Sequence, residues 1–185
     1  MTHKAIDVGS GPGKGFLMNF VHDYLPEWEE EGVEVTRLDA NPKVKPDILH
    51  NLMKPMPDKL KEQYDLAYMS HVLEHIAWRD APSVAKEVTT LIKPGGYFLI
   101  IVPSLEWAAK EICRGNYNLG VLMTIYGGQD DKWQFHNCGF TKAALSMLAE
   151  KIEMKVHSIR DGPTIVLANE KMFNSEQHEL FMCKE

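Results

Sequence analysis

With 185 residues, the chain is long enough to bury a sizeable core in one domain, so a second domain is not required. A hydrophobic content of 44% and a charged content of 25% are typical of a soluble globular protein, and no apolar run approaches the roughly 20 residues that span a bilayer. The formal net charge of −6, without a block of Lys or Arg, argues against nucleic acid as a partner. The chain enters its first strand at once, which leaves no room for a signal peptide, and its cysteines are scattered singly. We therefore expect a cytoplasmic protein with reduced thiols and no membrane partner.

Residues 5–15 are the most informative stretch of the sequence. They predict a strand and then a turn with glycine at alternate positions, and residues 16–24 predict a helix. Such a turn lets a ligand approach main-chain N–H groups at the positive end of the helix dipole, so we expect a small polar cofactor here. A dinucleotide site would need glycine where Lys14 stands, and a phosphate-binding loop would need Ser or Thr where Gly15 stands. A glycine turn without a ligand remains an alternative.

Asp39 ends the next predicted strand, residues 33–39, where Pro42 stops the run. One carboxylate can accept hydrogen bonds from both vicinal hydroxyls of a ribose, so we expect Asp39 to bind a sugar. A turn aspartate that caps its own loop is the alternative.

The rest of the chain alternates strands with helices, which predicts a parallel sheet covered on both sides. A helix break is expected at residues 93–96, and residues 164–168 fit a strand or a helix equally well. Residues 104–139 mix glycines, aromatic and polar side chains after a helix, which favours an ordered insertion that covers the substrate. The further predicted strands are 46–52, 64–69, 97–102, 154–160 and 178–183, and the further helices are 81–91, 105–114 and 141–151, the last capped by Thr141.

Three segments resemble those of a known family. They are the acidic-x-Gly-x-Gly-x-Gly pattern from Asp7 to Gly13, residues 68–76 and residues 91–97. In this order they resemble the class I methyltransferases that use S-adenosylmethionine (SAM), and within these the type 11 group that contains the quinone-biosynthesis enzymes. The resemblance implies an α/β, Rossmann-like, doubly wound and mostly parallel seven-stranded sheet with helices on both faces. It also implies that the last strand is antiparallel and that residues 1–185 form a single SAM-binding domain.

The resemblance further implies how the cofactor is held. The methionine end would lie on the glycine turn, the adenine beside Ala40, Asn51 and Leu52, and the transferring methyl near Ser70. Asn51 stands where the family often has aspartate, and its side-chain carbonyl can accept the same hydrogen bond. The cofactor-binding residues expected in this way are Asp7, Gly9, Ser10, Gly11, Gly13, Asp39, Ala40, Asn51, Leu52 and Ser70.

The implied activity is in-line transfer of a methyl group from SAM to an oxygen, nitrogen or carbon of a small-molecule acceptor, with S-adenosylhomocysteine as product. The methyl group is already activated, so orientation supplies much of the rate and few catalytic side chains are expected. His71 is the candidate catalytic base. We expect His71, Tyr126, Gln129 and His136 to contact the acceptor, with a purely structural role as the alternative for each, and we expect no metal.

Two other classes of function remain open. His71-x-x-Glu74-His75 matches a zinc peptidase pattern in which two histidines one helical turn apart bind the metal beside a catalytic glutamate, but this leaves the glycine turn and Asp39 unexplained. A SAM-binding sensor or partner subunit without catalysis is the second alternative, because the resembling family usually has extra helices before the first strand. Residues 104–139, or a neighbouring subunit of a homo-oligomer, would then close the site.

Overall fold

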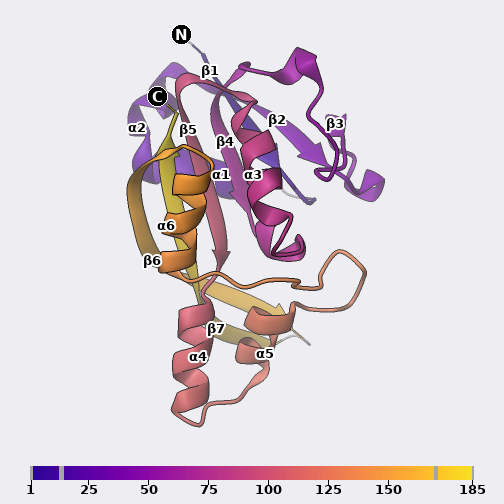
Figure 1. Ribbon diagram of the computed structural model, residues 1–185, viewed down its shortest axis with the longest axis vertical. Coiled ribbons are helices and arrows are strands. Elements are labelled where there is room, and N and C mark those ends of the chain that lie inside the picture. Colours follow the sequence, from indigo (N-terminus) through magenta and orange to yellow (C-terminus); the bar gives the residue numbers. More distant parts are fainter. Residues whose placement is uncertain (1, 13–14, 169–170, 185) are drawn as a thin grey trace.

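The computed structural model describes residues 2–12, 15–168 and 171–184, and it contains a seven-stranded sheet flanked by helices (Figure 1). The strands are β1 (His3–Val8), β2 (Val33–Asp39), β3 (Ile48–Leu49), β4 (Tyr64–Ser70), β5 (Ile92–Pro103), β6 (Lys155–Ala168) and β7 (Lys171–Cys183). The helices are α1 (Gly15–Tyr24), α2 (Pro26–Glu31), α3 (Ala81–Thr89), α4 (Leu105–Cys113), α5 (Leu119–Tyr126) and α6 (Lys142–Lys151). Three short 3₁₀ turns are η1 (Pro42–Val44), η2 (Asp58–Leu60) and η3 (Leu73–His75).

The strand order is β3-β2-β1-β4-β5-β7-β6, with β1 to β5 parallel and β7 antiparallel to both of its neighbours. This confirms the predicted doubly wound, mostly parallel sheet with an antiparallel last strand. The chain builds outward in one direction from β1 to β3 and in the other from β4 to β5. The strand order therefore reverses between β1 and β4, and ligands of open α/β sheets bind at the carboxyl ends of the strands beside such a reversal.

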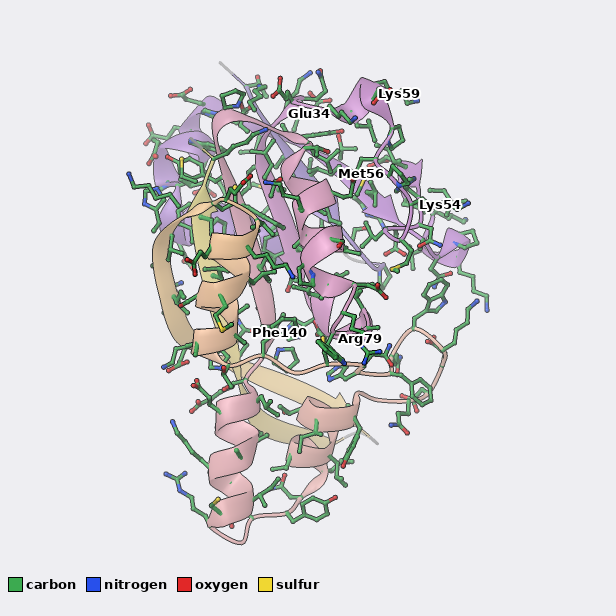
Figure 2. All side chains as sticks on the ribbon, in the orientation of Figure 1. Glu34, Lys54, Met56, Lys59, Arg79 and Phe140 are labelled. Carbon is green, nitrogen blue, oxygen red and sulfur yellow. The ribbon has the colours of Figure 1, made fainter. Side chains whose placement is uncertain are left out.

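Apolar residues bury both faces of the sheet. Figure 1 shows α3 and α6 in front of the sheet and α1 and α2 behind it. On the front face, Leu145 of α6 belongs to the same buried cluster as Phe98 of β5, and on the rear face Leu17 of α1 packs in a cluster with Leu99. Figure 2 shows Lys59 at the periphery of the molecule, whereas the side chain of Met56 is 3% exposed and belongs to the front cluster.

The helix expected to stop before residues 93–96 does stop, at Thr89, but these residues lie inside the next strand and not in a loop before it. Strand β5 begins at Ile92, and its register against β4 shifts between Tyr64 and Leu66. Residues 93–96 form an irregularity inside the strand, because Gly95 takes a φ of +78° and the Nζ of Lys93 lies 2.7 Å from a carboxylate oxygen of Asp65 on β4. The expectation that the fifth strand begins at Tyr97 was wrong for this reason.

Other boundaries also differ from the predicted ones. The strand expected over 46–52 is reduced to Ile48–Leu49 at the edge of the sheet. On either side of it, side chains take up main-chain N–H groups: Asp47 accepts from the N–H of Arg37 on β2, and Asn51 accepts from the N–H of Met53. Residues 164–168, left open by the sequence, belong to β6, and β7 begins at Lys171 rather than at His178. The cap of α6 is as predicted, since the hydroxyl of Thr141 accepts a hydrogen bond from the N–H of Ala144 at 3.1 Å.

The long β6–β7 hairpin extends past the sheet and carries a second small layer. Helices α4 and α5 lie beside its far end in the lower part of Figure 1, and both pack against β7. Helix α5 was not predicted, although its cap is regular: the side-chain oxygen of Asn118 accepts from the N–H of Val121 at 3.2 Å. Most of residues 104–139 therefore forms this layer, and only its final loop returns to the carboxyl end of the sheet.

Candidate functional site

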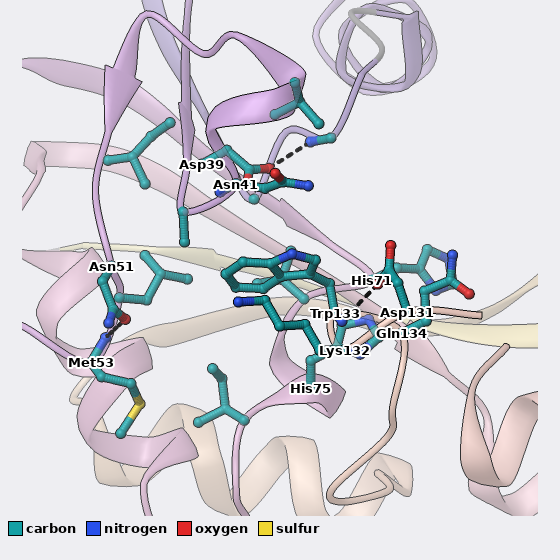
Figure 3. Close-up of a pocket in the computed structure, with 18 of the residues that line it drawn as sticks. Asp39, Asn41, Asn51, Met53, His71, His75, Asp131, Lys132, Trp133 and Gln134 are labelled. Carbon is teal, nitrogen blue, oxygen red and sulfur yellow. Dashed lines mark hydrogen bonds between the residues drawn. The ribbon is translucent and has the colours of Figure 1, made fainter. Parts of the chain in front are cut away.

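A cavity of about 490 Å³ lies at the carboxyl ends of the parallel strands, next to the reversal between β1 and β4 (Figure 3). Small-molecule sites typically have volumes of roughly 300–1,000 Å³. Four segments line the cavity: the glycine turn, the end of β2 with the loops that follow it, the start of the β4–α3 loop, and the loop before α6. The lining residues are Gly9, Gly11, Pro12, Leu38, Asp39, Ala40, Asn41, Val44, Asn51, Leu52, Met53, His71, Val72, His75, Ile76, Asp131, Lys132, Trp133 and Gln134.

Two glycines of the turn are required for different reasons. Gly9 has a φ of +73°, and a Cβ placed there would lie 2.3 Å from Cγ2 of Val72. Gly11 has a φ of +55°, and a Cβ there would meet no atom within 4 Å. Gly9 therefore permits close packing between the turn and the β4–α3 loop. At Gly11, by contrast, the space beside the backbone is empty, so a ligand can approach the main chain there.

Asp39 links the end of β2 to the glycine turn. One carboxylate oxygen accepts from the N–H of Gly11 at 2.9 Å and the other from the N–H of Asn41 at 2.7 Å. A carboxylate offers about four lone-pair positions, so about two stay available to a ligand. In Figure 3 this side chain faces the cavity, which makes Asp39 both an anchor of the turn and a candidate ligand.

Asp7 lies below the turn and does not line the cavity. Its side chain is 7% exposed, and burial raises its pKa to about 7, even though Arg37 on the neighbouring strand opposes the shift. The guanidinium of Arg37 donates to the carbonyl oxygens of Gly11 at 2.6 Å and of Val44 at 3.0 Å. Arg37 thus ties the turn to the loop after β2, and Asp7 lies beside Arg37 on the neighbouring strand.

An apolar wall lies beside the glycine turn, at the end of β2 and in the loops that follow it. It is formed by Leu38, Ala40, Val44 and Leu52, and Asn51 lies at its edge. The side-chain oxygen of Asn51 accepts from the N–H of Met53 at 3.0 Å. A flat aromatic group could pack against such a wall, with Asn51 as its polar neighbour.

His71 follows β4 at the mouth of the cavity and has an unusual backbone conformation, with a φ of +53°. Its Nδ1 lies 3.4 Å from a carboxylate oxygen of Glu74, and its Nε2 lies 3.3 Å from Oε1 of Gln177. Burial opposes the protonated form of His71, but Glu74 outweighs burial and raises the pKa of the imidazole. The side chain remains 40% exposed, so it can meet a ligand in the cavity.

Residues 131–134 cover the cavity from the side opposite the glycine turn. Figure 3 shows the indole of Trp133 lying across the opening, with the side chain of Lys132 beside it. The Nζ of Lys132 lies 4.6 Å from the centroid of the Trp133 ring. The side-chain oxygen of Asp131 accepts from the N–H of Trp133 at 2.7 Å, which stabilises this turn.

The structure brings together most, but not all, of the residues expected at the site. Gly9, Gly11, Asp39, Ala40, Asn51, Leu52 and His71 line the cavity, whereas Asp7, Ser10, Ser70 and Gln129 are not among its lining residues. Gly13 lies outside the described residues. Tyr126 and His136 line a second cavity of about 210 Å³, together with Glu74.

The zinc peptidase pattern does not have the backbone that it needs. His71 and His75 would have to lie one α-helical turn apart, but His71 has a φ of +53° and residues 73–75 form a 3₁₀ turn. Moreover, the carboxylate of Glu74 is 1% exposed, so it does not reach a substrate. The structure therefore contradicts the peptidase interpretation.

Several lining residues were missed by sequence reasoning. Asn41 and Val44 stand shortly after Asp39, the predicted ribose ligand, in the segment that forms η1 and its cap. Their closeness to Asp39 in the sequence was therefore a signal for them. Residues 131–134 had only the general signal of a glycine-rich, aromatic loop. Nothing local in the sequence distinguished Trp133 from Tyr126, which the structure places in the other cavity.

The fold and the cavity define a class of protein: a Rossmann-like domain of the class I methyltransferase type. A sequence profile described as the methyltransferase domain matches residues 2–146, which is more than half of the chain. The chain therefore belongs to the methyltransferase domain family, and the resemblance drawn from the glycine turn is confirmed at this level. Membership of the type 11 group stays a prediction.

Solved structures of methyltransferases share this fold. A SAM-dependent methyltransferase from Methanosarcina mazei matches with a TM-score of 0.65 at 18% identity, covering 99% of this chain and 92% of that one. The 1,6-didemethyltoxoflavin-N1-methyltransferase of Burkholderia thailandensis, solved with bound 1,6-didemethyltoxoflavin and S-adenosylhomocysteine, matches with a TM-score of 0.58 at 13% identity, covering 99% of this chain and 71% of that one. A protein from Bacillus halodurans described as a methyltransferase matches with a TM-score of 0.65 at 12% identity, covering 99% of this chain and 93% of that one.

No curated protein sequence matches this chain significantly. Among the helices of the described residues, none combines the length and the hydropathy that a transmembrane segment requires.

Proposed function

We propose that this protein transfers a methyl group from SAM to an oxygen, nitrogen or carbon atom of a small-molecule acceptor, with residues 1–185 acting as one SAM-binding domain. The observation that carries the proposal is the joint placement of Gly11, Asp39 and an apolar wall around one cavity at the carboxyl ends of β1 and β2. Membership of the methyltransferase domain family supports the same conclusion.

The donor set fits an amino-acid-bearing nucleoside. Open space beside the Gly11 backbone leaves room for a polar group against the main chain, and the free lone pairs of Asp39 suit the two hydroxyls of a ribose. The wall formed by Leu38, Ala40 and Leu52 suits a purine ring. A dinucleotide site would need a third glycine at the position that Lys14 occupies.

When bound, SAM supplies a methyl group that is already activated for displacement. The residues of this chain would then need to hold the cofactor, align an acceptor behind the methyl and exclude water, and alignment alone can lower the barrier by about 7–11 kcal/mol. We assign residues 131–134 as the part of the 104–139 insertion that covers the acceptor, with Trp133 nearest to it. His71 is the proposed base for an acceptor that must lose a proton, because it combines exposure to the cavity with a carboxylate partner.

Two measurements test the proposal. Calorimetric titration should show binding of SAM and of S-adenosylhomocysteine, and NAD should give no heat. Incubation with SAM carrying a labelled methyl group and a panel of phenols, amines and activated carbon acids should then transfer the label to at least one of them. A protein that binds NAD and not SAM would overturn the cofactor assignment. SAM binding without labelled product from any acceptor would instead favour a non-catalytic SAM-binding protein.

A further inference from the structure

Glu74 is a buried carboxylate whose ion-pair partners among the described residues are imidazoles. Its side chain is 1% exposed, and neither carboxylate oxygen makes a hydrogen bond of acceptable geometry with the described residues. An ionised carboxylate is costly to bury unless it is paired or binds a metal. Among the described residues, the groups within ion-pair distance of Glu74 are all histidines.

All three histidines approach Oε1 of Glu74, and Nδ1 of His71 is the nearest at 3.4 Å. Nε2 of His75 and Nε2 of His136 each lie 4.0 Å from Oε1 of Glu74, and the two imidazole rings meet edge to face with centroids 4.9 Å apart. His75 and Glu74 come from η3, whereas His136 comes from the loop that precedes α6. Ligand atoms from Glu74, His75 and His136 lie within 4.8 Å of one another.

The other ring nitrogens fix the tautomers of His75 and His136. Nδ1 of His75 lies 3.0 Å from the carbonyl oxygen of Phe135, and Nδ1 of His136 lies 3.0 Å from that of Thr124. A carbonyl oxygen can only accept, so both Nδ1 atoms carry a proton, and in the neutral imidazole each Nε2 then presents a lone pair. These lone pairs face the Glu74 carboxylate, an arrangement that a metal ion between them would stabilise.

We propose that Glu74, His75 and His136 bind a divalent transition-metal ion, and that the two imidazoles with one carboxylate favour Zn²⁺. Ligands of a tetrahedral zinc site stand roughly 3.3 Å apart at the usual zinc–nitrogen distances, so separations of 4.0 Å from Oε1, and of up to 4.8 Å within the cluster, need an inward movement of about 1 Å. Donation from the second ring nitrogen to a backbone carbonyl is the usual support of a histidine that binds metal. This site differs from the peptidase pattern, since Glu74 is a ligand and His136 replaces His71.

The ion would have a defined place in the fold. Main-chain N–H groups of Asn137 and Cys138 already donate to the carbonyl oxygen of Glu74, at 2.7 and 3.2 Å. A metal would tie the same loop to η3 through side chains as well, and it would thereby hold residues 131–134 over the cavity. His75 lines the large cavity while Glu74 and His136 line the second one, so the ion would stand between the two. The proposal departs from the expectation that no metal binds, and it does not depend on methyl transfer.

Metal binding can be measured directly on the full chain. After treatment with a chelator, the protein should take up one equivalent of Co²⁺ with the visible absorption of a low-symmetry, four- or five-coordinate ion, and Zn²⁺ should displace it. Deuterium exchange of the backbone amides in residues 127–137 should slow when Zn²⁺ is added.

Variants locate the site. His75→Ala and Glu74→Gln should each weaken Zn²⁺ binding by roughly 100-fold or more, since each removes a ligand. His22→Ala is the matched control, because His22 also pairs with a glutamate, Glu29 at 2.9 Å, but on the surface and outside the cluster. His75→Gln serves if the alanine variant does not fold, since His75 is 26% exposed and tolerates a polar replacement.

Two results would overturn the proposal. One is the lack of any stoichiometric Co²⁺ or Zn²⁺ binding by the folded wild-type protein. The other is equal Zn²⁺ affinity in the wild type, in folded His75→Ala or His75→Gln, and in His22→Ala. Loss of SAM binding or of methyl transfer would leave this conclusion untouched, because the readout is the metal itself.

Discussion

Replacement of Asp39 by alanine is the sharpest test of the proposed cofactor site. The carboxylate has about four lone-pair positions, and the N–H groups of Gly11 and Asn41 occupy two of them. The remaining two match the two hydroxyls of a ribose. A hydrogen bond to a charged group contributes about 1.5–3 kcal/mol, and water can hydrate the ribose hydroxyls once the carboxylate is removed, so the replacement should cost about 2–3 kcal/mol of binding free energy in all.

In dissociation constants, this loss corresponds to a roughly 30- to 150-fold weaker binding of S-adenosylhomocysteine, measured by calorimetric titration. Asp39→Asn keeps one acceptor oxygen without the charge and should lose roughly 10-fold. Asp80→Ala is the control, because Asp80 is exposed at the start of α3 and its side chain makes no cap hydrogen bond.

Asp39 also anchors the glycine turn, so its removal could act through the turn rather than through the ligand. A 2′-deoxy analogue of S-adenosylhomocysteine separates the two effects by a double-mutant cycle. The wild type should bind the analogue more weakly than the parent compound, whereas Asp39→Ala should bind both equally. If the deoxy analogue loses the same factor in both proteins, Asp39 does not contact the sugar and the reasoning fails.

Three further predictions test the scaffold. Gly9→Ala should lower the free energy of unfolding by about 2–4 kcal/mol, because the new Cβ would lie 2.3 Å from Val72 and the φ of this residue is positive. Adding Val72→Ala should restore part of the loss. Chemical unfolding measures both effects, and no loss of stability in Gly9→Ala would contradict this prediction. Burial raises the pKa of Asp7 to about 7, so folding favours its neutral form below pH 4 and this stability is lost as the pH rises through 7. Compared with Asp7→Asn, the wild type should lose up to about 4 kcal/mol between pH 4 and 8, and parallel pH profiles of the two proteins would refute the shift. Burial raises the pKa of the Cys138 thiol to about 11. At pH 8, iodoacetamide should therefore modify the exposed Cys113 at least about ten times faster than Cys138, as mass spectrometry of the peptides would show. Equal rates for the two cysteines would contradict the protection of Cys138.

The cofactor half of the cavity could be predicted because its determinants are local. Gly9 and Gly11 have positive φ values, which the glycine spacing anticipates, and Asp39 stands at the end of a strand that its alternating pattern identifies. In a parallel sheet, the carboxyl ends of neighbouring strands meet at one edge. Asp39 and Gly11 of the glycine turn are 28 residues apart in the sequence, yet they share a hydrogen bond because β1 and β2 are adjacent.

Ser70 and Asp7 show the limit of such reasoning. Both lie on strands that point at the cavity, but a strand alternates its side chains between two faces, and a position in the sequence does not fix which face meets a ligand. Asp7 lies beneath the turn, where it faces Arg37, and Ser70 is not among the lining residues. The two strands could be predicted from the sequence, but the directions of the Asp7 and Ser70 side chains near the carboxyl ends of these strands could not.

The cover of the cavity could not be predicted, because no local signal fixes its position. Residues 131–134 reach the cavity because the backbone that follows them is held by η3: the N–H of Asn137 donates to the carbonyl oxygen of Glu74 at 2.7 Å, and the side chain of Asn137 donates to that of His75 at 2.7 Å. These bonds join positions more than 60 residues apart, so sequence periodicity carries no trace of them. The segment that would contact the acceptor is thus attached to the fold by the same residues, Glu74 and His75, that form the proposed metal site. Those hydrogen bonds use main-chain carbonyls, so a change of the Glu74 or His75 side chain would reach this loop through the proposed metal ion. Such a change should alter acceptor selectivity more than cofactor affinity, as kcat/KM over the acceptor panel and calorimetric titration with SAM would show.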